Sequence, residues 1–293
     1  MQTVIYSTLA MIAFAANSLL NRLALGNSAI DAASYTTVRL VSGAILLGAI
    51  GMLNRDKGWL QQRGTWRSAV LLFLYAIAFS FAYLSLSTGT GALILFGSVQ
   101  LTMILAALIS GERPHFLEWT GLFLALSGLV YLVLPGLQAP SPLGSTLMAA
   151  AGISWGFYTL RGRGSNDPLE DTASNFIRTV PLVLVICLFN LKDFHLSTNG
   201  LLLAGISGAI TSGLGYVIWY AALRGLTTTR AATVQLSVPV LAAWSGIIFL
   251  SEEVSFRLML AGVLILGGIG LAVMGRGKKT DQVREQARVS PKR

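Results

Sequence analysis

Long apolar runs, each about the length of a membrane-spanning helix, constrain this chain more than any other feature of its sequence. A transmembrane helix needs about 20 mostly apolar residues to cross about 30 Å of hydrocarbon. Cutting the chain at its charged and turn-forming stretches leaves ten such runs, at approximately residues 3–24, 34–53, 66–87, 90–110, 116–134, 143–160, 172–191, 200–222, 228–251 and 256–275. The sequence therefore predicts an all-α membrane protein with ten transmembrane helices.

The scarcity of charge excludes a soluble protein. Only 11% of the 293 residues are charged, against roughly 25% in an ordinary soluble domain. The net charge of +9 could suggest nucleic-acid binding, but seven of the 21 Lys and Arg residues lie in the last 18 positions. The other basic residues lie between apolar runs and form no stripe with interleaved aromatic residues. We therefore expect no nucleic-acid partner and a surface in contact with lipid.

The distribution of Lys and Arg predicts the orientation in the membrane. The first run lacks the basic segment of a signal peptide and is long enough to span, so we interpret it as the first transmembrane helix. With a cytoplasmic N-terminus, the outer connections hold only Arg22, Lys192 and Arg257, and all other Lys and Arg of the connections and tail are inside. Because cytoplasmic loops are enriched in Lys and Arg, we expect a bacterial inner-membrane protein with both termini in the cytoplasm. Residues 276–293 would form a basic cytoplasmic tail.

The two halves of the chain repeat each other. The aligned pairs include Tyr75 with Tyr216 and Glu112 with Glu253 at an offset of 141 residues, and Arg39 with Arg178 at an offset of 139. Each half holds five predicted helices, an odd number, so the second half must be inverted relative to the first. Inverted repeats recur in secondary transporters, whose binding sites lie near the midplane between the halves. We expect one repeat over residues 3–138 and a second, inverted repeat over residues 139–275.

Two arginines lie within predicted spans and allow two interpretations. Inversion would place Arg39 near one membrane face and Arg178 near the other. Each could reach water or pair with a nearby acid, Asp31 for the first and Glu170 or Asp171 for the second. Alternatively, the two could close alternate mouths of a cavity. The first interpretation is favoured, because charges near span ends usually reach water.

The sequence offers no catalytic or metal-binding constellation. Both histidines lie in connections, Cys187 is isolated, and no span holds a His or Lys that could activate a serine. We therefore expect neither an enzyme nor a cofactor or metal. No Asp or Glu lies at a predicted midplane, where a proton relay needs one, so facilitated transport is the simpler expectation. Glu112 and Glu253 would mark helix ends, with gating the alternative.

Uncharged polar and aromatic residues are the candidates for binding a solute at depth. They are Asn17, Tyr75, Tyr83, Ser98, Gln100, Trp155, Tyr158, Tyr216, Tyr220, Gln235, Pro239 and Trp244. Amide and hydroxyl groups could bond the ends of a neutral zwitterion, while rings could stack on its side chain. The alternative for each aromatic residue is packing between helices. The two glutamines favour a cavity, because a lipid-facing amide is costly.

Small residues line the fifth and tenth predicted helices. The stretches "WTGLFLALSG" and "AGVLILGGIG" allow close helix contact. As the last helices of each repeat, they either brace the bundle or form a homodimer contact.

Several of these stretches resemble the EamA-type repeat of the drug/metabolite transporter superfamily. The resemblance rests on "LISGERPHFLEWTGL" and "LSVPVLAAW" near the ends of the two repeats, and on "ISWGFYTL" near the start of the second. The stretch "IAFAANSLL" keeps Asn17 but has Phe and Ala where the family often has Trp and Gly, and Arg39 and Arg178 match an arginine common in the second helix of each repeat. The resemblance implies ten helices in two inverted repeats, a central cavity and alternating access.

Within that superfamily the chain is most similar to bacterial exporters of amino acids, including aromatic ones, so amino acids are the expected solutes. A nucleotide-sugar carrier or a carrier of cationic solutes is the alternative within transport. Nucleotide sugars would need deep basic residues and cations a deep acid, and we expect neither at depth here. A membrane protein without transport activity is the remaining alternative.

Overall fold

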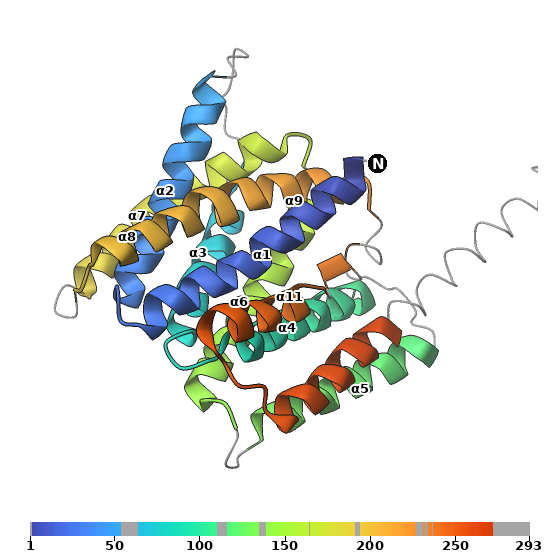
Figure 1. The fold of residues 1–293 in the computed structure, drawn as a ribbon. Helices are drawn as coiled ribbons and strands as arrows, with labels where there is room; N and C mark the ends of the chain where they lie inside the picture. Colours follow the sequence, from blue (N-terminus) through green and yellow to red (C-terminus); the bar gives the residue numbers. More distant parts are fainter. Residues whose placement is uncertain are drawn as a thin grey trace, which may run out of the picture.

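The computed structural model describes residues 2–53, 64–109, 116–134, 139–163, 165–190, 194–226, 231, 234–235 and 237–271. In this part of the chain the regular structure is helical, apart from an isolated bridge between Ile30 and Leu196 (Figure 1). The elements are α1 (Gln2–Gly26), α2 (Ala32–Leu53), α3 (Trp66–Ala82), α4 (Thr88–Ile109), α5 (Phe116–Val133), α6 (Pro142–Gly162), α7 (Pro168–Phe189), α8 (Thr198–Ile206), the π-helix η2 (Ser207–Leu214), α9 (Gly215–Leu223) and α11 (Ser237–Leu250). A further apolar helix runs over Phe256–Leu271.

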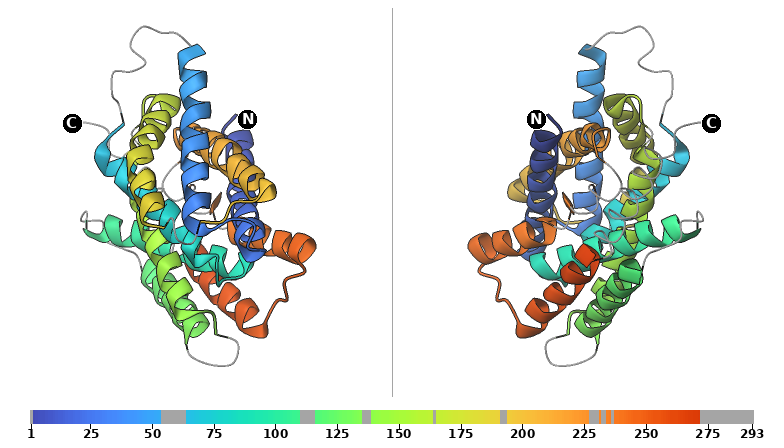
Figure 2. Two further views of the ribbon diagram at one scale, coloured as in Figure 1. Left: turned by 90° about the vertical axis from the view of Figure 1, so that its left-hand side faces the viewer. Right: turned by 90° about the vertical axis from the view of Figure 1, so that its right-hand side faces the viewer.

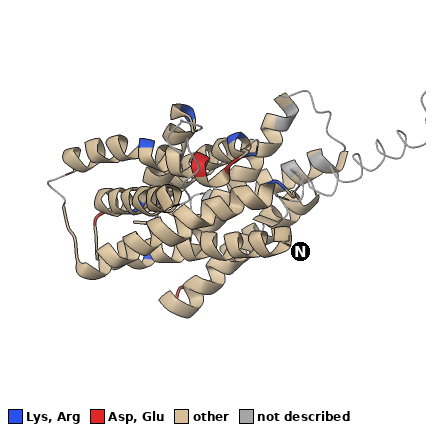
Figure 3. Ribbon diagram, turned by 90° about the horizontal axis from the view of Figure 1, so that it is seen from above, with Lys and Arg blue, Asp and Glu red and all other residues tan. Residues whose placement is uncertain are grey.

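The helices have the length and apolarity of membrane spans. Five stretches of the described chain are long and apolar enough to cross a bilayer: Gln2–Gly26, Ala32–Leu53, Thr88–Ala106, Pro168–Phe189 and Thr198–Leu223. Four shorter apolar helices are Trp66–Ala82, Trp119–Leu132, Ser237–Leu250 and Phe256–Leu271. The predicted all-α class is confirmed, and the count of ten crossings stays a prediction. Figure 3 shows how few charged residues the described helices carry.

Polar caps and prolines determine where several helices begin. The hydroxyl of Ser141 accepts a hydrogen bond from the amide of Gly144 ahead of α6, and the carboxylate of Asp167 accepts one from the amide of Glu170 ahead of α7. A proline follows each cap, at the first position of the helix. A backbone N–H at this position would have no partner within the helix, so the proline costs no hydrogen bond.

The helix contacts follow a two-fold pattern. Helix α3 packs against α6, while α1 packs against the segment formed by α8, η2 and α9; α4 also packs against α6, while α1 also packs against α11. Helices α2 and α7 pack against each other, as do α4 and α11. A two-fold axis between the two halves would exchange α1 with α6, α3 with the segment formed by α8, η2 and α9, and α4 with α11, and the observed contacts follow this pattern. The first helix of each half therefore contacts the third and fourth helices of the other.

A π-helix interrupts the third long helix of the second half. It falls in the stretch "GISGAITSGLG", and η2 packs against α1 and α2. A methyl group at Gly208 would overlap the backbone carbonyl oxygen of Arg39, so the η2 and α2 backbones approach as closely as glycine permits. Single π-turns inside α-helices are frequent at functional sites.

Helix α5 and the helix Phe256–Leu271 form a pair beside the remaining helices (Figure 1). Their backbones meet at Gly268, where a methyl group would lie 2.6 Å from the carbonyl oxygen of Gly121. The outward faces carry exposed apolar side chains such as Phe123 and Val263. These two helices thus contact each other within the chain, and the homodimer contact stays a prediction. The C-terminal part of α2 extends beyond its neighbours (Figures 1 and 2).

Candidate functional site

Polar and aromatic side chains from both halves meet in the middle of the helices. Asn17 comes from α1, Arg39 from α2, Tyr75 from α3, Trp155 from α6, Ser212 from η2 and Tyr216 from α9. We call these six residues the central cluster. Each is buried, and their contacts with one another connect six elements of the fold.

Asn17 ties α1 to the π-helix and to α3. Its side-chain oxygen accepts hydrogen bonds from the hydroxyls of Ser207 (2.7 Å), Thr211 (3.2 Å) and Ser212 (3.3 Å), and its side-chain nitrogen donates to the hydroxyl of Tyr75 (3.4 Å). These three hydroxyls can reach one oxygen because the wider π-turn presents them on the same face. The amide acceptor of Asn17 is therefore fully used.

Arg39 is a buried cation at the centre of the cluster. Its side chain is 1% exposed. Nε donates to the hydroxyl of Ser212 (2.8 Å), and Nη2 donates to the hydroxyls of Tyr216 (2.8 Å) and Tyr75 (3.3 Å). The guanidinium carbon lies 5.1 Å from the ring centre of Phe79 and 5.3 Å from that of Tyr75. Among the described residues it forms no ion pair with an acid, and Nη1 has no hydrogen-bond partner.

Residues separated by 141 positions contact each other within this cluster and at its edge. The hydroxyl of Tyr216 donates to that of Tyr75 (3.3 Å). The rings of Phe14 and Trp155 meet edge to face with their centres 5.5 Å apart. A residue contacts its own counterpart only near a two-fold axis, so the cluster lies where the two halves of the chain meet.

A continuous series of aromatic rings runs through the molecule. From the C-terminal end of α3 it follows Tyr83, Phe79, Tyr75, Trp155, Tyr158 and Tyr220, with successive ring centres 4.8, 5.3, 4.9, 5.5 and 5.5 Å apart. Tyr83 lies at the end of the molecule where α3 ends, and Tyr220 near the opposite end, where α9 ends. The series passes through the central cluster at Tyr75 and Trp155.

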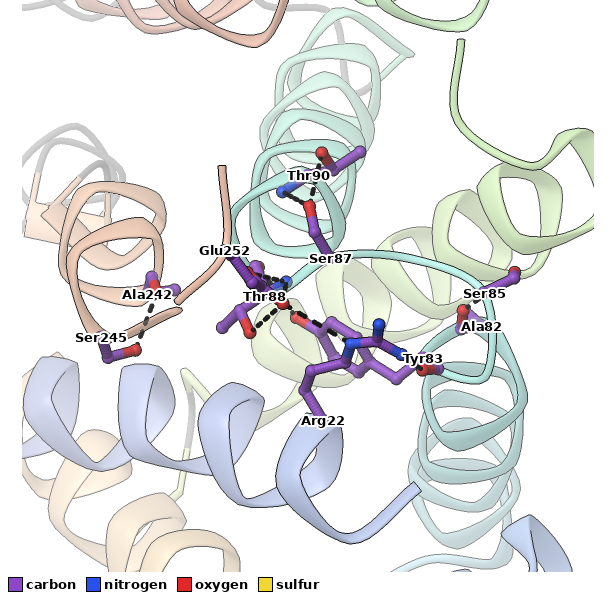
Figure 4. A network of polar contacts seen from close by, with 10 residues as sticks. All are labelled: Arg22, Ala82, Tyr83, Ser85, Ser87, Thr88, Thr90, Ala242, Ser245 and Glu252. Atoms are coloured by element: carbon purple, nitrogen blue, oxygen red, sulfur yellow. Dashed lines mark hydrogen bonds and ion pairs between the residues drawn. The ribbon is translucent and has the colours of Figure 1, made fainter. Parts of the chain in front are cut away.

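A polar network lies at the end of the molecule near Tyr83 (Figure 4). The carboxylate of Glu252 accepts hydrogen bonds from the backbone amide of Thr88 (2.8 and 2.9 Å) and from its hydroxyl (3.1 Å), and pairs with Arg22 Nε at 3.5 Å. Arg22 also donates to the backbone carbonyl of Tyr83 (3.1 Å). We call Arg22, Tyr83, Thr88 and Glu252 the latch, because they join α1, α3, α4 and the segment after α11.

The two connections that precede α2 and α8 are also joined. The amide of Asp31 donates to the carbonyl of His195, and the amide of His195 donates to the carboxylate of Asp31, both at 3.0 Å. The same carboxylate accepts from the amide of Ser34 at the start of α2 (2.8 Å). Both connections belong to the latch end of the molecule.

Polar contacts at the opposite end are fewer among the described residues. Arg161 donates to the hydroxyls of Ser68 (3.0 Å) and Thr65 (3.1 Å), which joins the end of α6 to the start of α3. Beside this contact lies an open groove of about 650 Å³, lined by Trp66, Arg67, Val70, Leu71, Phe157, Leu160 and Arg161. Trp66 and Phe157 are exposed there, so the groove lies on the outside of the molecule, apart from the central cluster.

The structure brings together some of the residues predicted to bind a solute and separates others. Asn17, Tyr75, Trp155 and Tyr216 form part of the central cluster, and the ring series holds Tyr83, Tyr158 and Tyr220. Ser98 and Gln100 are buried in α4, where the Ser98 side chain packs close to Gly152 of α6. Gln235 is buried and donates to the carbonyl of Ala231, and Pro239 is buried in α11.

Trp244 lies away from the cluster, because it is 63% exposed on the outside of α11. It lies five positions after the buried Pro239, which at 100° per residue places it about 140° around the helix. The expectation that Trp244 shares the wall of the binding site is therefore corrected.

The favoured interpretation of Arg39 is wrong. It reaches neither water nor Asp31, because the carboxylate of Asp31 binds the amides of Ser34 and His195 instead. The expectation that no basic residue lies at depth is wrong for the same reason. Its counterpart Arg178 is only half-buried and donates to the side chain and backbone carbonyl of Ser174 in its own helix. The two copies are thus used differently.

Only one of the two acids that were expected to mark helix ends lies among the described residues. Glu112 lies outside the described residues, and Glu253 is exposed. The neighbouring Glu252 makes the latch contacts instead. A pair of adjacent acids gives no sign of which one faces inward. The hydroxyls of Ser207, Thr211 and Ser212 were not predicted to belong to the site, although their spacing of four and five residues was an available signal. Among the described residues, no group of three or more His, Cys, Asp and Glu lies close enough together to hold a metal ion.

Comparisons with known proteins identify the family. Residues 1–134 and 142–274 each match the model of the EamA-like transporter family. An uncharacterized protein of Pseudomonas aeruginosa is 49% identical over 275 residues, which cover 94% of this chain and 96% of that relative. A probable amino-acid metabolite efflux pump of Salmonella typhimurium is 28% identical over 68% of this chain and 70% of its own length, and one of Escherichia coli is 26% identical over 63% and 67%.

A solved crystal structure has the same fold. It superposes with a TM-score of 0.65 over 91% of this chain and 98% of its own, at 21% sequence identity, and this likeness concerns the fold alone. The resemblance predicted from the sequence is confirmed by the two family matches. The chain belongs to the EamA-like transporter family, carries two copies of its domain, and is a membrane transporter and not an enzyme.

Proposed function

We propose that this chain exports neutral amino acids, including aromatic ones, and similar small metabolites by alternating access. The observation that carries the proposal is the central cluster, where buried polar groups and aromatic rings from both halves meet midway along the helices. In transporters built from inverted repeats, the solute binds at this level. A structural protein would have no need of a charged, hydrogen-bonded centre, which is costly to bury.

The composition of the cluster supports an amino acid as solute. Its hydroxyl, amide and guanidinium groups can bind the polar ends of a small zwitterion. The rings of Tyr75, Trp155 and Tyr216, with centres 4.6 to 6.4 Å apart, can stack on an apolar or aromatic side chain. Two relatives are described as probable amino-acid metabolite efflux pumps.

The latch suggests how access would alternate. We assign the latch end to the outer face, because the connections at this end hold few Lys and Arg residues and the positive-inside rule places such connections outside. Release of Glu252 from Thr88 and Arg22 would open the cluster to the outside, while Arg161 with Thr65 and Ser68 would hold the inner end. The ring series would then line the path between the two ends.

The central cluster contains no Asp or Glu, which favours facilitated export without strong proton coupling. Proton-driven transport generally needs an ionisable group at depth that releases its proton near neutral pH, and an arginine does not. We further propose that the protein lies in the bacterial inner membrane with both termini in the cytoplasm, with repeats over residues 3–138 and 139–275 and a homodimer contact through α5 and Phe256–Leu271.

A nucleotide-sugar carrier is the second candidate, and Arg39 is the observation that favours it. A buried cation attracts an anionic solute. A diphosphate nevertheless carries at least two negative charges, whereas the described part of the cluster holds one positive charge. The same cation argues against a carrier of cationic drugs.

Efflux from liposomes tests the proposal. Purified protein would be reconstituted with radiolabelled phenylalanine, tryptophan or threonine, with and without an imposed pH gradient. We expect efflux that ignores the gradient, falls when Trp155 is replaced by alanine, and persists in Trp244→Ala. Efflux that requires the gradient would contradict facilitated export, and efflux of no amino acid would contradict the choice of solute.

A further inference from the structure

The guanidinium of Arg39 has more capacity to donate hydrogen bonds than the protein uses. Nε and Nη2 bind the hydroxyls of Ser212, Tyr216 and Tyr75. Nη1 is buried and has no hydrogen-bond partner among the described residues. A guanidinium is always charged and has five N–H donors. Burying such a group without an acid costs several kcal/mol, so a purely structural role would be better filled by a neutral side chain.

Within the central cluster, the buried polar atoms that have no hydrogen-bond partner are donors. Three hydroxyls occupy the side-chain oxygen of Asn17, and the hydroxyl oxygen of Tyr75 accepts from Asn17, Arg39 and Tyr216. The indole N–H of Trp155 is buried and also unpartnered. Its ring packs on Tyr75 (4.9 Å) and Tyr216 (4.6 Å), the two tyrosines that hold Nη2 of Arg39. The centre therefore carries a positive charge and unused donors.

We propose that Arg39 forms a carboxylate-binding subsite, in which Nη1 binds the carboxylate of the transported solute. A carboxylate supplies the single negative charge and the acceptor oxygens that the cluster lacks, and guanidinium–carboxylate hydrogen bonds are among the strongest in proteins. The rings of Tyr75 and Phe79 lie beside the guanidinium of Arg39, and Trp155 packs on Tyr75. These rings suit an aromatic side chain or an ammonium group. This inference rests on the proposed function in taking an amino acid as the solute.

Arg178 provides a matched control for the chemistry of Arg39. The two residues correspond in the repeats, but Arg178 is half-buried and bonds to Ser174 in its own helix. Only the copy in the first repeat reaches the central cluster. Replacing Arg178 therefore removes the same kind of positive charge as replacing Arg39, but leaves the subsite intact.

Binding competition tests the subsite in the unmodified protein first. Displacement of radiolabelled phenylalanine would be measured on protein in nanodiscs, with 3-phenylpropionate, which keeps the carboxylate, and with phenylalaninamide, which lacks it. We expect the amide to bind roughly 10- to 100-fold more weakly than phenylalanine, the range for losing a hydrogen bond to a charged group. Equal affinity for the amide and the acid would overturn the proposal.

The variants then locate the effect. Arg39→Gln should lose this preference for the acid while keeping its affinity for the amide, and Arg178→Gln should keep the preference. Arg39→Lys should retain part of this preference, because the positive charge remains while the planar guanidinium, which can bind both oxygens of a carboxylate, is lost. If Arg39→Gln fails to fold, the comparison of the acid, the amide and Arg39→Lys decides the question. A preference for the acid that persists in Arg39→Gln would overturn the assignment.

A second readout separates this inference from the proposed function. Thermal stabilisation by 3-phenylpropionate and by phenylalanine, without any transport, reports the subsite directly. Stabilisation of the wild type but not of Arg39→Gln, in a protein that exports no amino acid, would uphold the subsite and contradict the proposed function. Export of amino acids by a protein that no carboxylate stabilises would uphold the proposed function and contradict the subsite.

Discussion

Breaking the latch should open one end of the molecule, and the size of the effect follows from its contacts. Glu252→Gln keeps one acceptor oxygen but loses the charge, so the ion pair with Arg22 at 3.5 Å and one charge-assisted bond from Thr88 are lost. A hydrogen bond to a charged group contributes about 1.5–3 kcal/mol, and a partly exposed ion pair at most about 1 kcal/mol. Allowing for partial access of solvent, we expect a loss of about 2 kcal/mol, which is roughly 30-fold in the equilibrium between the closed and open states.

Labelling of a single cysteine measures that change. Ser18 lies one turn before Arg22 in α1, and its side chain is buried below the latch. With Cys187 replaced by serine, the Ser18→Cys protein in right-side-out vesicles would be exposed to a membrane-impermeant thiol reagent. The labelling rate follows the open fraction, so Glu252→Gln should raise it roughly 30-fold.

The neighbouring acid is the control for this measurement. Glu253 is exposed, so Glu253→Gln should leave the labelling rate unchanged. Equal rates for the two variants would refute the reasoning, because the acid that makes the contacts would then have no special role. Faster labelling of Glu252→Gln only in inverted vesicles would refute the assignment of the latch to the outer face.

Three further predictions follow from packing and capping. Gly208→Ala should lower the Tm in detergent and reduce transport, because overpacking costs about 1–3 kcal/mol. Gly205→Ala should leave the Tm unchanged, because nothing lies within 4 Å of the added methyl group. Equal Tm values for the two variants would contradict the close approach of η2 to α2. Trp155→Ala should abolish phenylalanine efflux while Trp244→Ala, at a side chain 63% exposed, retains it, and the reverse order would contradict the placement of the cluster. Asp31→Ala should cost about 1 kcal/mol as a lost helix cap, seen as a lower Tm, and an unchanged Tm would contradict its role in joining the two connections.

The lengths of the apolar runs and the offset between the two halves were sufficient to predict the helical class and the repeat, because both depend on local composition and spacing. The offset of 141 residues aligned Tyr75 with Tyr216, and these two residues contact each other. The break between the third and fourth predicted spans is present, but α3 ends at Ala82, five residues before the predicted end at residue 87, and α4 begins at Thr88.

The environment of individual side chains could not be predicted in the same way, because burial depends on neighbours distant in the sequence. Arg39 lies only a few residues inside its span and was expected to reach water, but η2, α3 and α9 supply its hydrogen bonds and leave it buried. The π-helix itself has no simple sequence signature, since a stretch rich in Gly and Ser also suits close packing in a regular helix. Which of Glu252 and Glu253 meets Thr88 depends on the path of the chain after α11, where Ser251 adopts a positive φ of 52°.

Counterflow of phenylalanine tests most directly whether this protein is a carrier of amino acids. Liposomes loaded with unlabelled phenylalanine would be diluted into a trace of the labelled amino acid, with no gradient of pH or potential. An alternating-access carrier exchanges solute across the membrane, so labelled phenylalanine should accumulate transiently inside and then decline as the internal pool empties. Uptake that rises no faster than in liposomes without protein would contradict amino-acid transport through the central cluster.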